Sequence, residues 1–242
     1  GTVTGVQTCA LPISILSAPG VRTPGFWVNK SWTSFWDGIA GNEPSQAGTA
    51  NFAKSDLFLA PYTNCPGTVT VNSKSVLAVR DSVTGTNAPG LLLGDWNRNG
   101  IRDNGEQTIF YSTDESLKIM NSSLQPDKGD VRYTLARSLV ASWLNYMAGN
   151  AVDTANSSDK DARIWINEGI TWLQTYTPDE NKDGKGDGML SKLTTISSPY
   201  MRSSNPAWSN STTGGSVINT NLDNFNNGRG SLADGTFYGG NP

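Results

Sequence analysis

The chain has 242 residues, a formal net charge of −3, no histidine and two cysteines, and only 16% of its residues are charged. Without histidine there is no Ser-His-Asp or Cys-His catalysis and no His-ligated zinc or haem, and two cysteines are too few for a Cys-only zinc site. The acidic balance argues against a nucleic-acid partner, and no apolar run approaches the roughly 20 residues of a membrane-spanning helix. Eight tryptophans and 36% hydrophobic residues are enough for a buried core.

Near the N-terminus, the string Val3–Ser14 resembles the conceptual translation of a sequencing-library adapter. On this resemblance, residues 1–14 are expected to be an artefact of a metagenomic or draft contig, with the native chain starting near Ile15. The apolar stretch Ala10–Ala18 looks like the end of a signal peptide, but it lacks a basic region and overlaps the same string, so it is set aside as targeting evidence. Cys65 is then either inert or paired with a cysteine upstream, which fits an oxidising compartment.

Further along, the sequence predicts an α+β fold made of short β-strands, a hairpin and amphipathic helices. Residues 22–36 are rich in aromatic side chains, and loop is expected after them up to residue 66. Alternating apolar residues then predict a hairpin and two short strands at 67–83, 91–93 and 107–111. A threonine followed by two acids predicts a short helix that begins at Thr113 and ends near Asn121.

Two longer helices are predicted from apolar residues that recur at helical spacing. They span Val131–Ala148 and Ser158–Tyr176, and Pro178 stops the second. Because about ten polar residues join them, the two helices are expected to pack antiparallel. From Ser197 to Pro242 the chain is rich in Ser, Asn, Thr and Gly and is expected to be an extended segment along the surface or partly disordered. A single globular domain would then span residues 15–196.

The strongest motif is Asp95–Glu106, which has the pattern of a twelve-residue EF-hand-type calcium loop. Oxygen-bearing side chains stand at positions 1, 3, 5, 9 and 12, glycine stands at position 6, and position 7 would offer its backbone carbonyl. Calcium takes six to eight hard oxygen ligands, and two amides in place of carboxylates suit a weak extracellular site, with a Kd of about 10⁻⁴–10⁻³ M. A solvated turn is the alternative. The predicted ligands are Asp95, Asn97, Asn99, Ile101, Asp103 and Glu106.

A second, weaker candidate loop begins at Asp179, directly after the second long helix. Positions 1, 3, 5, 6 and 9 match the calcium pattern, but position 12 is Leu190, so the bidentate ligand is absent or comes from elsewhere. A polar turn is the alternative, and magnesium is less expected than calcium at either loop. The predicted ligands are Asp179, Asn181, Asp183, Lys185 and Asp187.

Four segments resemble, in the same order, motifs of a family of secreted bacterial and archaeal modules. Thr23–Lys30 is similar to the family's opening Thr-x-Gly-Tyr-Trp-Lys-Asn-His, Tyr111–Met120 to its short helix, Leu135–Asn145 to its Leu-Ala-Arg helix and Leu222–Gly228 to its closing Leu-Asp-x-Tyr-Asn-Asn-Gly. The resemblance implies secretion, a cell-surface or matrix context, neighbouring calcium-loop repeats like those of adhesins, and no established catalytic activity. Lys30 stands where the family has His, and the family's C-terminal Cys is absent, so neither a role for that His nor an N-to-C disulfide carries over.

The function expected from these observations is a secreted, calcium-stabilised structural module of an extracellular or cell-surface assembly. A surface of low charge opposes close self-packing only weakly, so a filament or layer of identical subunits is expected, or else cell-surface protein partners. The alternative is a carbohydrate-binding or adhesion module with glycan-stacking rings, although aromatic residues at this density more often pack in the core. The candidate rings are Trp27, Trp32 and Trp36.

A hydrolase with paired carboxylates is the least favoured class. Glu168 with Asp161 or Glu115 would be the candidates, but nothing in the sequence places two acids about 5–9 Å apart, as glycosidases require. No enzyme activity is therefore expected.

Overall fold

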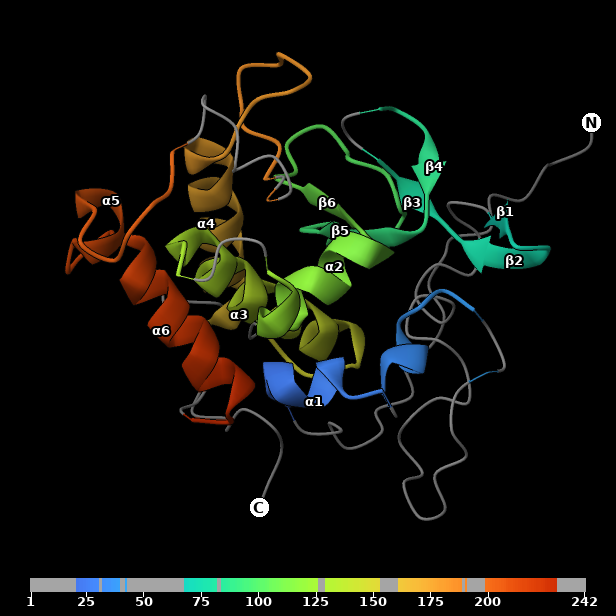
Figure 1. Cartoon of the computed structure of the whole chain (residues 1–242), viewed down its shortest axis with the longest axis horizontal. Helices are drawn as coiled ribbons and strands as arrows, with labels where there is room; N and C mark the ends of the chain where they lie inside the picture. Colours follow the sequence, from blue (N-terminus) through green and yellow to red (C-terminus); the bar gives the residue numbers. More distant parts are fainter. Residues whose placement is uncertain are drawn as a thin grey trace, which may run out of the picture.

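The computed structural model describes residues 21–30, 32–39, 42, 68–81, 84–125, 129–152, 161–188, 190 and 199–229. In this part of the chain, helices gather on one side and short antiparallel strand pairs on the other (Figure 1). The mixed α+β class is therefore confirmed. The Val3–Ser14 string, the Ala10–Ala18 stretch and Cys65 lie outside the described residues. Within them, no helix has the length and apolar character that crossing a membrane requires.

The strands form three separate antiparallel pairs: β1 (Thr68–Val71) with β2 (Lys74–Leu77), β3 (Val79–Arg80) with β4 (Asn87–Ala88), and β5 (Gly90–Leu93) with β6 (Ile109–Ser112). The predicted hairpin is confirmed as β1–β2. Its two turn residues, Asn72 and Ser73, have φ of 50° and 63°, as a tight two-residue turn between twisted strands requires. In the buried β5–β6 pair, Leu93 lies opposite Ile109. This pairing brings together the two ends of the predicted calcium loop.

The helices are α1 (Pro24–Val28), α2 (Thr113–Met120), α3 (Val131–Met147), α4 (Ala162–Tyr176), α5 (Pro206–Ser209) and α6 (Gly215–Asn226), with short 3-10 turns η1 (Thr33–Phe35) and η2 (Ser122–Leu124). Helix α3 is buried along almost its whole length and packs against α1, α2, α4 and α6. The predicted short helix and the two long helices are confirmed as α2, α3 and α4.

Helices α3 and α4 run antiparallel, as expected. The side chain of Arg132, at the start of α3, donates a hydrogen bond of 3.0 Å to the carbonyl of Tyr176, at the end of α4. At the middle of both helices, Gly169 leaves room for Leu139, whose Cδ1 would lie 3.3 Å from a Cβ added at the glycine. The two helices therefore approach each other closely at Gly169, in the centre of the core.

The C-terminal part contradicts the expectation of an extended segment. Residues 215–226 form α6, which packs on α3 and α4. Ile218, Leu222 and Phe225 are buried and spaced at i, i+4 and i+7, which is one face of a helix. The Asn and Thr residues between them are more exposed, and they give the segment the composition of a loop although its apolar residues keep the helical period. The expectation for 230–242 falls outside the described residues.

Three of the motif segments meet in a buried polar network. The side-chain oxygen of Asn145, on α3, accepts hydrogen bonds from the Arg22 backbone N–H at 2.7 Å and from the Trp27 indole at 3.3 Å. The Asn145 amide donates to Asn226 on α6, and Asn226 in turn donates to the carbonyl of Ser138. Buried amides that satisfy one another in this way fix the register of the packed elements.

Candidate metal centre

The first half of the loop Asp95–Glu106, called loop 1 below, is folded around the carboxylate of Asp95. This side chain is 0% exposed and accepts backbone N–H groups from Asn99 at 3.2 Å and Gly100 at 2.7 Å. The side-chain oxygens of Asn97 and Asn99 accept the N–H groups two residues further on, at 3.0 Å and 2.9 Å. Gly100 has φ of +74°, which the sharp reversal requires. Together these bonds turn positions 1, 3 and 5 toward the inside of the loop.

The second half of loop 1 closes onto the same interior. The amide groups of Asn97 and Asn99 both donate to the Oδ2 of Asp103, at 2.5 Å and 2.6 Å. Glu106 folds back, and its Oε2 accepts the N–H of Asp103 at 3.2 Å. The Ile101 side chain is 40% exposed, so this residue could contribute to an ion only through its backbone. The structure thus brings together the predicted side chains at positions 3, 5, 9 and 12.

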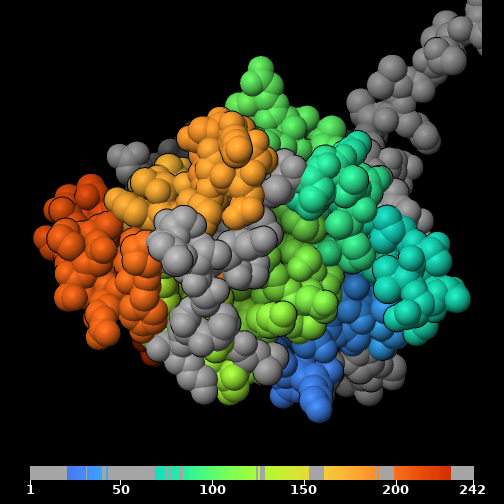
Figure 2. Space-filling view, turned by 45° about the horizontal axis from the view of Figure 1, so that its top comes forward, coloured from blue at the N-terminus to red at the C-terminus, as the bar shows by residue number. Residues whose placement is uncertain are grey.

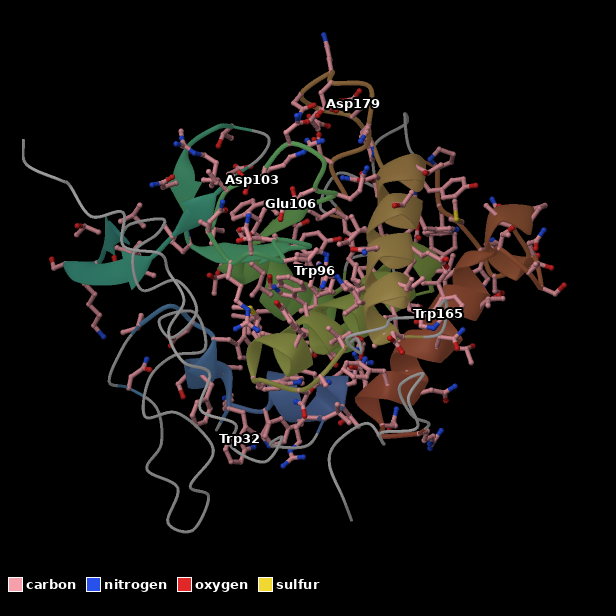
Figure 3. All side chains as sticks on the ribbon, turned by 180° about the vertical axis from the view of Figure 1, so that it is seen from behind. Trp32, Trp96, Asp103, Glu106, Trp165 and Asp179 are labelled. Atoms are coloured by element: carbon pink, nitrogen blue, oxygen red, sulfur yellow. The ribbon has the colours of Figure 1, made fainter. Side chains whose placement is uncertain are left out.

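Two residues at even positions hold loop 1 against the helices. Trp96 donates from its indole N–H to Asn167 on α4 at 2.9 Å, and the Arg163 guanidinium lies 4.4 Å from the centre of a Trp96 ring. Arg98 lies 4.3 Å from the Tyr146 ring centre and donates to the Tyr146 hydroxyl at 3.2 Å. Figure 3 places Trp96 inward of Glu106, toward the helices. Trp96 and Arg98 therefore contact the helices, whereas the predicted ligand side chains of Asn97, Asn99 and Asp103 contact one another within the loop.

Asp179–Asp187, called loop 2 below, repeats the turn of loop 1. Asp179 accepts the N–H groups of Asp183 at 3.2 Å and Gly184 at 2.9 Å, while Asn181 and Asp183 accept the N–H groups two residues further on, each at 3.0 Å. At position 4, Lys182 has φ of +60° where Arg98 has +57°. The weaker sequence match therefore adopts the same local fold.

Loop 2 differs in the electrostatics of its carboxylates. Burial raises the pKa of Asp187, the neighbouring carboxylates Asp179 and Asp183 raise it further, and the backbone N–H groups of Glu180 and Asn181 oppose the rise. By contrast, the N–H of Lys185, aided by the guanidinium of Arg102, lowers the pKa of Asp183. Asp187, at position 9, therefore lies within electrostatic reach of the carboxylates at positions 1 and 5.

At position 12 of loop 2, Leu190 is fully buried, and its N–H donates to Glu115 at 3.0 Å. The Leu190 carbonyl accepts the Tyr133 hydroxyl at 2.9 Å. Position 12 is therefore an apolar anchor to the core, and its backbone is engaged by α2 and α3. Glu115, considered above as a catalytic acid, serves here as the acceptor for that backbone.

The two loops lie side by side. Arg102 of loop 1 makes an ion pair of 3.3 Å with Asp183 of loop 2, and the Lys185 ammonium donates to Gln107 at 3.3 Å. Figure 2 shows the green and orange loops in contact on one face, and Figure 3 places Asp103, Glu106 and Asp179 at that same end of the molecule. A cleft of about 450 Å³ is lined by residues 102–107 and Lys185.

Amide and carbonyl oxygens would have to supply part of any metal shell here. Among the described residues, no group of three or more Asp, Glu, Cys or His side chains has an arrangement that could hold a metal ion by itself. Loop 1 adds two asparagines and backbone carbonyls to its three carboxylates. A shell of mixed neutral and anionic oxygens suits calcium, whereas zinc prefers nitrogen and sulfur ligands.

The three tryptophans considered for glycan stacking do not form a platform. Trp27 and Trp36 are 0% and 1% exposed, and the Trp36 indole donates to the Trp27 carbonyl at 3.1 Å. The glycan-stacking alternative is therefore wrong for these two, because their rings lie in the core, which is the packing that the sequence favoured. Trp32 is half-buried and stacks between Phe26 and Phe35, with ring centres 4.7 Å and 5.7 Å apart.

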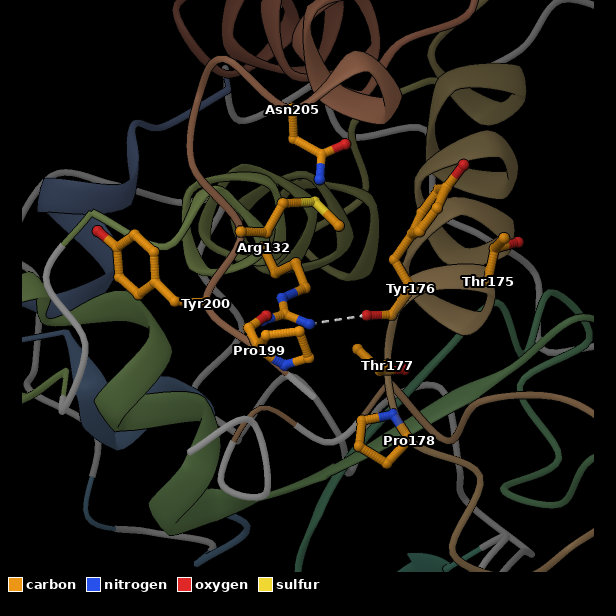
Figure 4. A pocket seen from close by; sticks show the side chains of 9 residues that line it. Arg132, Thr175, Tyr176, Thr177, Pro178, Pro199, Tyr200 and Asn205 are labelled. Carbon is orange, nitrogen blue, oxygen red and sulfur yellow. Dashed lines mark hydrogen bonds between the residues drawn. The ribbon is translucent and has the colours of Figure 1, made fainter. Parts of the chain in front are cut away.

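A second cleft, of about 320 Å³, lies beside Arg132 (Figure 4). Among the described residues that line it there is no carboxylate. The Arg132 guanidinium donates to both oxygens of Asp130 and to the carbonyls of Tyr176 and Pro199. These bonds tie the start of α3 to the end of α4, so the buried charge pair is structural. Glu168 lies on the exposed face of α4, where partial burial raises its pKa.

Comparisons with models of protein families, with curated proteins and with solved structures give no match. The resemblance of the four motif segments to the secreted modules therefore stays a prediction.

Proposed function

We propose that this chain is a secreted, calcium-binding structural module of an extracellular or cell-surface assembly. The observation that carries the proposal is the double role of loop 1. Oxygen-bearing side chains stand at the sequence spacing of a calcium loop, and those of Asn99 and Asp103 meet within the loop. Trp96 and Arg98, at the even positions between, contact the two central helices. An ion that fixes the inner face of the loop would thereby also fix its contacts with α3 and α4.

The expected energetic effect is modest and depends on concentration. A ligand that binds only the folded chain stabilises it by RT ln(1 + [L]/Kd), which is about 1.4 kcal/mol at ten times the Kd. With a Kd of about 10⁻⁴–10⁻³ M, such stabilisation would need calcium at millimolar levels. Those are extracellular levels, which agrees with the secretion that the motif resemblance implies.

Self-association is the favoured way for such a module to act. Charged residues make up 16% of the chain and the net charge is −3, so charge repulsion between copies is weak. A filament or layer of identical subunits, stabilised by calcium within each subunit, would use this property. The enzyme classes discussed above have no comparable support.

Thermal unfolding with calcium, with magnesium and with EGTA tests the calcium part. Calcium should raise the melting temperature by a few degrees, magnesium should do so less, and Glu106→Gln should remove most of the calcium effect. A melting temperature that is the same in calcium and EGTA contradicts the proposal.

Size-exclusion chromatography and negative-stain microscopy with calcium test the assembly part. We expect particles larger than one chain. A strictly monomeric sample at high concentration contradicts the assembly part of the proposal. It does not affect the calcium part, which the thermal unfolding experiment tests separately.

A further inference from the structure

The two loops share a turn but differ at position 5, where a calcium loop needs a ligand. In loop 1 this residue is Asn99, whose amide donates to Asp103 within the same loop. In loop 2 it is Asp183, whose Oδ1 accepts the N–H of Lys185 and whose Oδ2 lies 3.3 Å from the guanidinium of Arg102. A ligand of loop 2 is thus already neutralised by a cation that belongs to loop 1.

The other charges on loop 2 do not make the same contact. Lys185 directs its ammonium to Gln107, and Lys182 stands at position 4, which corresponds to the outward-pointing Arg98 of loop 1. Asp179 and Asp187 are engaged by backbone N–H groups of loop 2 itself. In these contacts, Arg102 is the charged residue from outside loop 2 that pairs directly with one of its predicted ligands.

From this contact we propose that Arg102 acts as a tethered cation that lowers the affinity of loop 2 for calcium, so that loop 1 fills first and loop 2 only at higher concentration. The inference rests on the proposed calcium binding. A divalent ion that enters loop 2 must either displace the guanidinium from Asp183 or bind beside it against repulsion. Both routes weaken binding. In loop 1 the residue at the same position is the neutral Asn99, and the carboxylate that it contacts, Asp103, is bonded only to neutral amide groups in these contacts.

Calorimetric titration of the full chain with calcium chloride tests the order of filling. Two binding events are expected, and Asp183→Asn should remove the weaker one, which assigns it to loop 2. Arg102→Gln should tighten the weaker event about threefold to tenfold at low salt and leave the stronger event within about twofold. The gain should shrink at 1 M salt, where the Debye length falls to about 3 Å.

Two variants control for charge and shape. Arg102→Lys keeps a cation at the same place and should keep the weaker event weak. Lys118→Gln removes the same charge from the exposed end of α2 and should change neither event. Circular dichroism in EGTA checks that each variant folds like the parent chain.

The outcomes separate this inference from the proposed function. If the parent chain binds no calcium, both are overturned. If it binds calcium but Arg102→Gln leaves the weaker event unchanged or weakens it, only the role of Arg102 is overturned. If Lys118→Gln tightens that event as much as Arg102→Gln does, general charge repulsion replaces the contact with Asp183 as the cause.

Discussion

From position 1 to position 7, loop 1 and loop 2 make the same hydrogen bonds between side-chain oxygens and backbone N–H groups, but the two loops differ in their contacts with the core. The residue at position 1 of loop 1, Asp95, is completely buried, whereas its counterpart in loop 2, Asp179, is exposed. Position 4 of loop 1, Arg98, packs on Tyr146, whereas Lys182 of loop 2 is exposed. The two loops therefore have a similar turn, but loop 1 is packed against the core and loop 2 is exposed to solvent.

The difference shows how a local motif becomes part of global stability. A turn that only satisfies its own backbone can open without disturbing the rest of the fold, because few other contacts are lost. Loop 1 cannot open without releasing Trp96 from Asn167 and Arg98 from Tyr146. An ion bound there should stabilise the whole domain, while an ion in loop 2 should stabilise mainly the loop itself.

The largest expected effect comes from removing the first ligand of each loop in EGTA. Asp95→Ala leaves the buried N–H of Gly100 without its carboxylate acceptor and should lower the free energy of unfolding by about 3–5 kcal/mol. Asp179→Ala breaks the same two bonds in solvent and should cost about 1 kcal/mol. Urea unfolding followed by circular dichroism measures both. Equal losses would contradict the difference in anchoring.

The anchors at position 4 form a second matched pair. Arg98→Ala removes a cation–π contact and a hydrogen bond to Tyr146 and should cost about 1–2 kcal/mol. Lys182→Ala removes an exposed side chain and should stay within about 0.5 kcal/mol of the parent chain. The same urea unfolding assay applies. A loss at Lys182 as large as that at Arg98 would show that the backbone conformation at position 4, and not the packing, decides the cost.

Much of this arrangement was predictable where its cause is local. The ligand positions follow from spacing within twelve residues, the hairpin from two alternating runs around Asn72, and α3 and α4 from apolar residues at helical spacing. The outward direction of Arg98 was also predictable from its even position in loop 1. Each of these features is determined by residues that are close in the sequence, so the sequence alone was enough to predict it.

The rest depends on contacts between distant residues. Trp96 binds Asn167, which lies 71 residues further along, and Arg98 binds Tyr146, which lies 48 residues further along. The pairing of the two loops follows from where β6 and α4 place them, and no local pattern encodes it. Helix α6 was missed because its Asn and Thr residues resemble a loop in composition. The sequence favoured core packing over glycan stacking for the tryptophans, and Trp27 and Trp36 are buried in the core.

A smaller effect concerns the closing ligand of loop 1. Glu106→Gln retains one oxygen that can accept the Asp103 N–H, but it removes the negative charge and the second oxygen that bidentate binding of calcium would need. In EGTA its stability should equal that of the parent chain, and in millimolar calcium it should lack about 1 kcal/mol of ligand-linked stabilisation. Thermal melts at several calcium concentrations measure the difference. A variant that still gains stability from calcium like the parent would exclude Glu106 as a ligand.

The smallest effect is also the sharpest comparison, because one substitution should act with opposite sign in the two loops. Arg98 and Lys182 both have left-handed backbone conformations, with φ of 57° and 60°, which glycine adopts without steric cost. Lys182→Gly loses little packing, so relief of strain should raise the free energy of unfolding by up to about 0.5 kcal/mol. Arg98→Gly gains the same relief but releases Tyr146 from the loop, so it should lower that free energy by about 1 kcal/mol. Urea unfolding of both variants beside the parent in EGTA resolves the sign. A gain in both would mean that contact with the helices contributes nothing to loop 1, and the distinction between an anchored and a solvent-exposed loop would then fail.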